Sequence, residues 1–86
     1  MPDIMDLLMD SRVAEVSDAI LRYLAMHPDA ADSATGILQW WLKDLDFSPS
    51  SLQLREALTV LIEKGLVQRD QRASGIDIYS AYVRPQ

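Results

Sequence analysis

The chain has 86 residues, of which 49% are hydrophobic and none is cysteine, and its net charge is −5. This length fits a single domain, close to the lower size at which a hydrophobic core alone stabilises a fold. The absence of cysteine excludes a disulfide framework, a thiolate zinc site and a cysteine nucleophile. No segment approaches the roughly 20 apolar residues of a membrane span, and the first residues are acidic, so we expect a cytoplasmic protein without a secretory signal.

The charge is divided unevenly along the chain. Residues 1–47 contain three basic and nine acidic residues, a net charge of −6, whereas residues 48–86 contain five basic and four acidic residues, a net charge of +1. Affinity for nucleic acid comes mainly from neutralising phosphates. The charge of residues 48–86, which is close to neutral, is therefore compatible with DNA binding but is not evidence for it.

The first ten residues, MPDIMDLLMD, would place Ile4, Leu7 and Leu8 on one face of a helix. Two interpretations follow: a frayed end or short helix that closes the core of its own chain, or an arm that packs on a second subunit. Apolar side chains at this density are rarely left in water. We therefore assign residues 1–10 to an N-terminal apolar arm or short helix, and residues 11–86 to the domain.

Residues 11–27 predict the first helix of the domain, because apolar side chains recur at helical spacing at Val13, Val16, Ile20, Leu21 and Leu24. Pro28 forbids continuation, since the residue before a proline is pushed out of the α region. His27 is the only histidine. At a helix C-terminus its imidazole can interact with the last carbonyls, so we assign it a structural role. Residues 28–33 predict a polar connection.

A second helix is predicted to begin at a cap formed by Asp32 or Ser33 and to run to about Leu45. Its buried face would contain Ile37, Leu38, Trp41, Leu42 and Leu45. Trp40 is then about 100° from Trp41 around the helix axis, toward the flank. Trp40 either packs partly against the N-terminal segment or the C-terminal hairpin, or it anchors an interface, since tryptophan is enriched among the residues that dominate binding energy.

The stretch from Phe47 to Val67 reads as a turn, a capped helix and the beginning of a strand. Ser48 is the predicted N-cap, with Pro49 at the first helical position. Gly65 supplies the left-handed residue that commonly ends a helix. The apolar face of this third helix contains Leu54, Leu58, Leu61 and Ile62.

Residues 66–71 and 76–83 predict two strands joined by a turn at 72–75, because the second segment alternates with a period of two. We expect Ile76 and Ile78 to point to one side and Tyr79 and Val83 to the other. A single hairpin is marginally stable in isolation, so it must pack on the helices.

The FSPSS turn, the helix that follows it and the Gly-Leu-Val exit into a hairpin resemble the third helix and wing of the winged helix-turn-helix family. The resemblance covers roughly residues 11–84. It implies a mainly α fold with a small β-hairpin: three core helices, a two-stranded wing and a short N-terminal helical arm. Most members of the family lay the third helix in the major groove of DNA. A minority are protein-interaction or dimerisation modules.

If the third helix reads DNA, eight residues of the helix and wing are candidates for contact: Ser50, Ser51, Gln53, Arg55, Thr59, Arg69, Arg72 and Arg84. Arginine and glutamine have the donors and acceptors that match guanine and adenine edges, and serine can meet a phosphate. Glu56 and Glu63 would repel the DNA backbone. The other interpretation of these residues is a solvated surface.

Catalysis is not expected, because the chain has one histidine, no cysteine and no Gly-rich phosphate loop. The remaining carboxylates, such as Asp44 and Asp46, are ordinarily solvated or act as caps. No cluster has metal-ligand spacing, so we predict no metal, no cofactor and no small-molecule substrate.

Two functions remain after these exclusions. The first is a protein-interaction or dimerisation module, expected to be a homodimer or to hold another protein through Ile4, Leu7, Leu8 or Trp40. The alternative is a DNA-binding transcriptional regulator that turns its acidic half away from DNA. No interaction with a membrane is expected.

Overall fold

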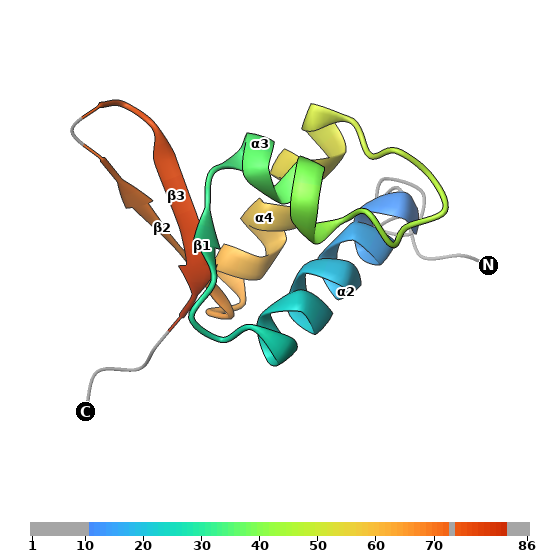
Figure 1. Ribbon diagram of the computed structural model, residues 1–86, viewed down its shortest axis with the longest axis horizontal. Helices are drawn as coiled ribbons and strands as arrows, with labels where there is room; N and C mark the ends of the chain where they lie inside the picture. The colour runs from blue at the N-terminus through green and yellow to red at the C-terminus, as the bar shows by residue number, and fades with distance from the viewer. Residues whose placement is uncertain (1–10, 73, 83–86) are drawn as a thin grey trace.

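The computed structural model describes residues 11–72 and 74–82. Within these ranges it contains, in chain order, α2 (Ser11–Met26), β1 (Ala31–Asp32), α3 (Ala34–Gly36), the π-helical turn η1 (Ile37–Trp41), α4 (Ser51–Glu63), β2 (Val67–Gln71) and β3 (Asp77–Ala81). The helices pack together on one side of the molecule and the sheet lies on the other (Figure 1). The result is a small α/β domain with three helical segments, α3 continuing directly into η1, and a three-stranded antiparallel sheet.

Some of the predicted features fall outside these ranges. The apolar arm at 1–10, with Ile4, Leu7 and Leu8, is not among the described residues, and neither are Val83 and Arg84. In the part of the chain that is described, no helix is both long enough and apolar enough to span a membrane.

The prediction of the first helix is confirmed. α2 ends at Met26, before Pro28, and it buries Val13, Val16, Ala19, Ile20 and Leu24. Leu21, which was predicted to share this face, is only half-buried. α2 packs mainly against α4, so the apolar stripe of the first helix forms one half of the core.

The segment between α2 and α3 is more than the polar connection that was predicted. Ala31 and Asp32 form β1 and pair antiparallel with Ser80 and Tyr79 of β3. The sheet order is β1-β3-β2, so the predicted two-stranded wing is wrong by one strand. Two residues are too few to show alternation in a sequence, and this strand exists because the chain leaving α2 comes back beside the hairpin.

The second helix begins as predicted but ends early. Ser33 is its N-cap, and the hydroxyl accepts a hydrogen bond from the N–H of Gly36 at 3.3 Å. The helix then changes to a π turn and ends at Trp41, not near Leu45. Ile37, Trp41 and Leu42 are buried, while Leu38 and Leu45 are half-buried. Over so few residues, α and π turns place nearly the same side chains inward, so apolar spacing could not separate them.

The N-terminus of α4 lies two residues later than predicted. Ser50, not Ser48, is the N-cap: its hydroxyl accepts a hydrogen bond from the N–H of Gln53 at 3.0 Å. The Oε1 of Gln53 in turn accepts from the N–H of Ser50 at 3.0 Å. This reciprocal pair is a capping box, which needs a long polar side chain three residues after the cap. Ser48 has only Ser51 at that position, so a cap at Ser48 could not close one.

The C-terminus of α4 confirms the role predicted for Gly65, whose φ is 73°. Its N–H donates to the carbonyl of Ile62 at 3.0 Å, and the N–H of Leu66 donates to the carbonyl of Leu61 at 2.9 Å. These two bonds form a Schellman motif, which satisfies carbonyls that the helix leaves unpaired. α4 buries Leu54, Ala57, Leu58 and Leu61, while Ile62 is half-buried.

The two faces of the sheet differ, as the alternation predicted. Tyr79 and Ala81 of β3 pack against the core, and Val67 of β2, which pairs with Ala81, is buried. Ile78, between Tyr79 and Asp77 in the strand, is half-buried and is not among the side chains that pack on the core, as expected for the opposite face. Ile76, just before β3, is 54% exposed. The helices therefore cover one face of the sheet and leave apolar side chains uncovered near its other face.

Candidate functional site

A stack of aromatic rings joins α2 to the π turn. The rings of Tyr23 and Trp41 are nearly parallel, with centroids 4.7 Å apart and an interplanar angle of 12°. The ring of His27 lies against Tyr23 at 4.5 Å between centroids. Such contacts contribute stability beyond the burial of apolar area. The histidine predicted to be structural thus makes a ring contact at the end of its helix.

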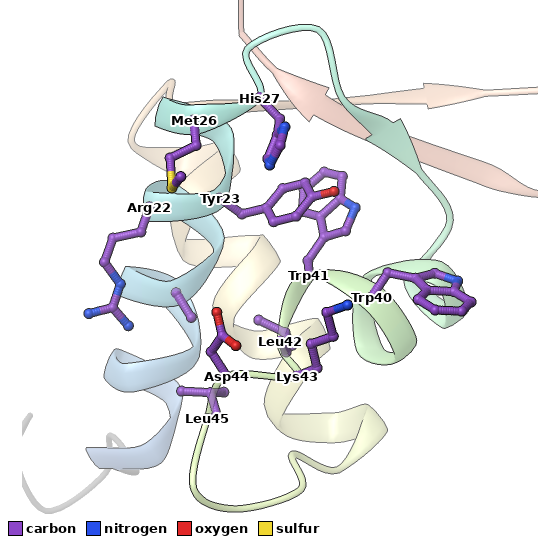
Figure 2. Close-up of a pocket in the computed structure, with 11 residues that line it drawn as sticks. Arg22, Tyr23, Met26, His27, Trp40, Trp41, Leu42, Lys43, Asp44 and Leu45 are labelled. Atoms are coloured by element: carbon purple, nitrogen blue, oxygen red, sulfur yellow. The ribbon is translucent and has the colours of Figure 1, made fainter.

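The stack lines a hollow of about 630 Å³ between α2, η1 and residues 42–45, which we call the aromatic groove. Figure 2 shows Arg22 and Met26 on the α2 side of this groove, Trp40 on the other side, and Tyr23 and Trp41 between them. Met26 is 78% exposed and Trp40 is 59% exposed. Two large apolar side chains therefore flank the groove while remaining in contact with water.

Trp40 lies outside the core, as its angular position predicted. The Nζ of Lys43 is 5.8 Å from the centroid of its ring, within the range of a cation–π contact. Lys43 leaves more than half of the indole exposed. Trp40 is thus an exposed aromatic side chain beside a groove that contains other aromatic rings.

A second hollow, of about 360 Å³, adjoins the aromatic groove and shares Arg22, Asp44 and Leu45 with it. Its other lining residues are acidic. Glu15 and Asp18 come from α2, and Asp46 comes from the turn after η1. We call Glu15, Asp18, Asp44 and Asp46 the acidic strip. None of these carboxylates forms an ion pair with another described residue.

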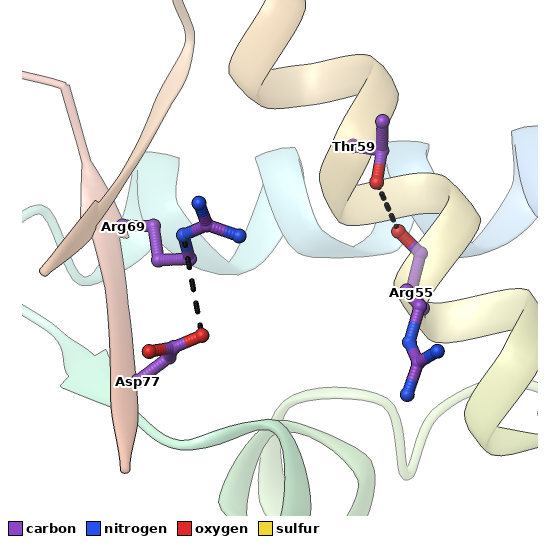
Figure 3. A network of polar contacts seen from close by, with 4 residues as sticks. All are labelled: Arg55, Thr59, Arg69 and Asp77. Atoms are coloured by element: carbon purple, nitrogen blue, oxygen red, sulfur yellow. Dashed lines mark hydrogen bonds and ion pairs between the residues drawn. The ribbon is translucent and has the colours of Figure 1, made fainter. Parts of the chain in front are cut away.

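The predicted DNA-contact residues are divided by the fold. Ser51, Arg55 and Thr59 of α4 and Arg69 of β2 line one hollow of about 420 Å³ between α4, α3 and the inner face of the sheet. Figure 3 shows Arg55 and Thr59 on the helix facing the strand that carries Arg69. Arg72 does not line this hollow. Four of the eight candidates are therefore brought together.

The side chains of five of the eight DNA-contact candidates have a hydrogen-bond or ion-pair partner within the described residues. Ser50 and Gln53 are engaged in the capping box. The Oγ1 of Thr59 donates to the carbonyl of Arg55 at 2.9 Å. The side chain of Arg55 is exposed and forms no ion pair with a described residue.

The two described arginines of the hairpin lie beside aspartates. The Nε of Arg69 is 4.0 Å from an oxygen of Asp77, and a guanidinium nitrogen of Arg72 is 3.6 Å from an oxygen of Asp70. Both pairs are at least partly exposed, so each adds little stability. The aspartates nevertheless offset the positive charge that the hairpin would present to a phosphate.

The aromatic groove and the acidic strip were largely missed from the sequence. Tyr23 lies seven residues after Val16 and three after Ile20 and packs partly against the core, so its spacing does not mark it as lining a hollow. Glu15 and Asp18 are three residues apart and so share a helix face. Their proximity to Asp44 depends on how the turn after η1 packs beside α2, which the spacing could not reveal.

Among residues 11–72 and 74–82, no group of three or more histidine and acidic side chains could hold a metal ion. Comparisons of the chain with family models, with curated proteins and with solved structures give no match.

Proposed function

We propose that this chain is a small, non-catalytic winged-helix protein that acts as a protein-interaction or dimerisation module. The observation that carries the proposal is the aromatic groove, where Trp40 and Met26 are exposed beside the stacked rings of Tyr23 and Trp41. Large aromatic side chains that can be desolvated in a concave site are typical anchors of protein interfaces. The groove offers such an anchor without any rearrangement of the core.

The order of the elements supports the winged-helix part of the proposal. A first helix is followed by a short capped helix, by α4 and then, through Gly65, by the β2–β3 hairpin. β1 adds an edge strand to this hairpin. The order matches the resemblance drawn from the FSPSS turn and the Gly-Leu-Val exit.

A DNA-binding regulator is the second candidate. It is favoured by the hollow that gathers Ser51, Arg55, Thr59 and Arg69, because these side chains lie between α4 and the hairpin. The distribution of charge speaks against DNA binding, because Arg69 and Arg72 lie beside aspartates and the chain carries a net charge of −5. Phosphate neutralisation supplies most non-specific affinity for DNA, so we rank this candidate second.

The deciding experiment combines light-scattering mass over a range of protein concentrations with a salt series of binding to a random-sequence DNA duplex pool. We expect no retention on DNA even at low salt, and a mass above that of one chain would identify the interaction as dimerisation. A monomer whose DNA binding weakens steeply with salt would overturn the proposal and support the regulator.

A matched pair of variants locates the interface. Trp40→Ala should weaken binding at the groove, whether to another protein or to a second copy, by about tenfold or more, as expected for an anchor residue. Leu52→Ala is the control, because Leu52 is 62% exposed on α4 and does not line the aromatic groove. Binding equal to that of the parent in both variants, to the partner and to a second copy alike, would exclude the groove as the interface.

A further inference from the structure

The aromatic groove shares lining residues with a hollow whose side chains carry a net negative charge. Arg22, Asp44 and Leu45 line both hollows, and together the two hollows place four carboxylates against the cations of Arg22 and Lys43. No ion pair within the described residues offsets these carboxylates. A partner that covers this surface should therefore supply positive charge, because like charges brought together at an interface are strongly unfavourable.

A second copy of the chain is a poor occupant for this surface. Each copy carries a net charge of −5, and residues 1–47, which contain the groove and the strip, carry −6. Two copies that met through this face would place acidic strips against each other. The charge distribution therefore favours a different protein.

The other half of the surface requires an apolar contact. Met26 and Trp40 are exposed at its edges, and Tyr23 and Trp41 lie between them. Lys43 and Arg22 lie along the same groove, but Lys43 is positioned near the face of Trp40. The surface is thus amphipathic, with an aromatic end and an acidic end.

We propose that the aromatic groove and the acidic strip together bind a basic amphipathic segment of a partner protein. A leucine, methionine or aromatic side chain of the segment lies beside Trp40 and Met26, and its lysines or arginines face the acidic strip. This inference rests on the proposed interaction function and specifies the chemistry of the partner. Recognition combines a desolvated apolar anchor with charges that steer the encounter.

The test uses a short synthetic amphipathic peptide of leucine and lysine as the probe, with two comparison peptides. One is a scrambled peptide of the same composition, and the other replaces lysine with glutamate. Binding is measured by calorimetry and by the tryptophan emission of the protein, since the peptides contain no tryptophan. We expect the leucine-lysine peptide to bind at least about tenfold more tightly than either comparison peptide, a difference of about 1.4 kcal/mol.

Two double variants with the same net charge distinguish attraction of the peptide to the acidic strip from non-specific attraction to the whole protein. Asp18→Lys with Asp46→Lys changes the strip, and Glu56→Lys with Glu63→Lys changes α4; both raise the net charge from −5 to −1. We expect the strip variant to lose about tenfold in affinity and the α4 variant to lose less than about threefold. Trp40→Ala should also lose about tenfold. Circular dichroism checks folding, and Asp18→Asn with Asp46→Asn replaces the strip variant if that variant unfolds.

Several outcomes would overturn the inference. These are equal weakening in both charge variants, equal binding of the scrambled peptide, and no binding of the leucine-lysine peptide. A strip variant that changes the light-scattering mass would show instead that this face lies between copies of the chain. If the peptide fails to bind while Trp40→Ala still reduces self-association, the inference fails and the proposed function stands. If Trp40→Ala changes neither peptide binding nor self-association, both the inference and the proposed function fail.

Discussion

Gly36 shows how one side chain constrains the beginning of a helix. It is buried in the first turn of the second helical segment, and a Cβ placed there would collide with the carboxylate of Asp32. That carboxylate accepts a hydrogen bond from the N–H of Ser33 at 2.8 Å. A side chain at this position would therefore force the Asp32 carboxylate to move, whereas the φ of Gly36, −64°, suits any residue.

Gly36→Ala should destabilise the fold by about 1 to 3 kcal/mol, because the added methyl group displaces Asp32 from its place beside Ser33. Urea unfolding measures the effect. In an Asp32→Ala background the same substitution should be neutral or stabilising by up to about 1 kcal/mol, since alanine is the better helix former. An equal cost in both backgrounds would contradict the proposed collision.

The helix α4 is defined at both ends by local backbone interactions. Its N-terminus is satisfied by the reciprocal hydrogen bonds of Ser50 and Gln53, and its C-terminus by the two bonds around Gly65. Between these ends, the buried leucines face α2 across the core. The helix therefore presents Arg55 and Thr59 on its exposed side as a consequence of where its apolar residues are.

Ser50→Ala should cost about 1 kcal/mol of stability, the typical value for the loss of an N-cap. Ser48→Ala is the matched control and should change stability by less than about 0.5 kcal/mol, because Ser48 is exposed and outside the capping box. Both are measured by urea unfolding. A larger loss in Ser48→Ala than in Ser50→Ala would place the beginning of the helix at the earlier serine.

The arrangement of charge across the fold separates two surfaces. The acidic strip lies beside the aromatic groove between α2 and η1, while the hollow with Arg55 and Arg69 lies between α4 and the sheet. On the hairpin, Asp70 and Asp77 lie beside the arginines. The capacity to bind a polyanion therefore depends on local pairing as well as on the total charge.

Asp70→Asn with Asp77→Asn should increase affinity for a random duplex at low salt by a few fold and steepen its salt dependence, because Arg69 and Arg72 then face solvent without a neighbouring carboxylate. The control, Asp18→Asn with Asp46→Asn, makes the same change of net charge from −5 to −3 on the acidic strip. Filter binding or anisotropy provides the measurement. Identical affinities for the two variants would show that pairing on the hairpin does not mask its arginines.

Local sequence was sufficient for many features of the fold. Pro28 ended α2, Gly65 ended α4, and apolar residues at helical spacing identified Val16, Ile20, Leu54 and most of the other core positions. These features depend on neighbours a few residues away, so their signals are contained in short segments. The capping box at Ser50 is equally local, and it was missed because the pair Ser48-Pro49 also fits the pattern of a helix start.

The remaining features required the packed chain. β1 exists because Ala31 and Asp32 meet β3, which lies far along the sequence, and the acidic strip exists because the turn after η1 lies beside α2. The angular position of Trp40 was readable from the sequence, but the groove beside it needs Tyr23 and Met26 from another element. Strand pairing and concave surfaces are contacts between distant segments, and a periodic pattern within one segment carries no information about which segment it will face.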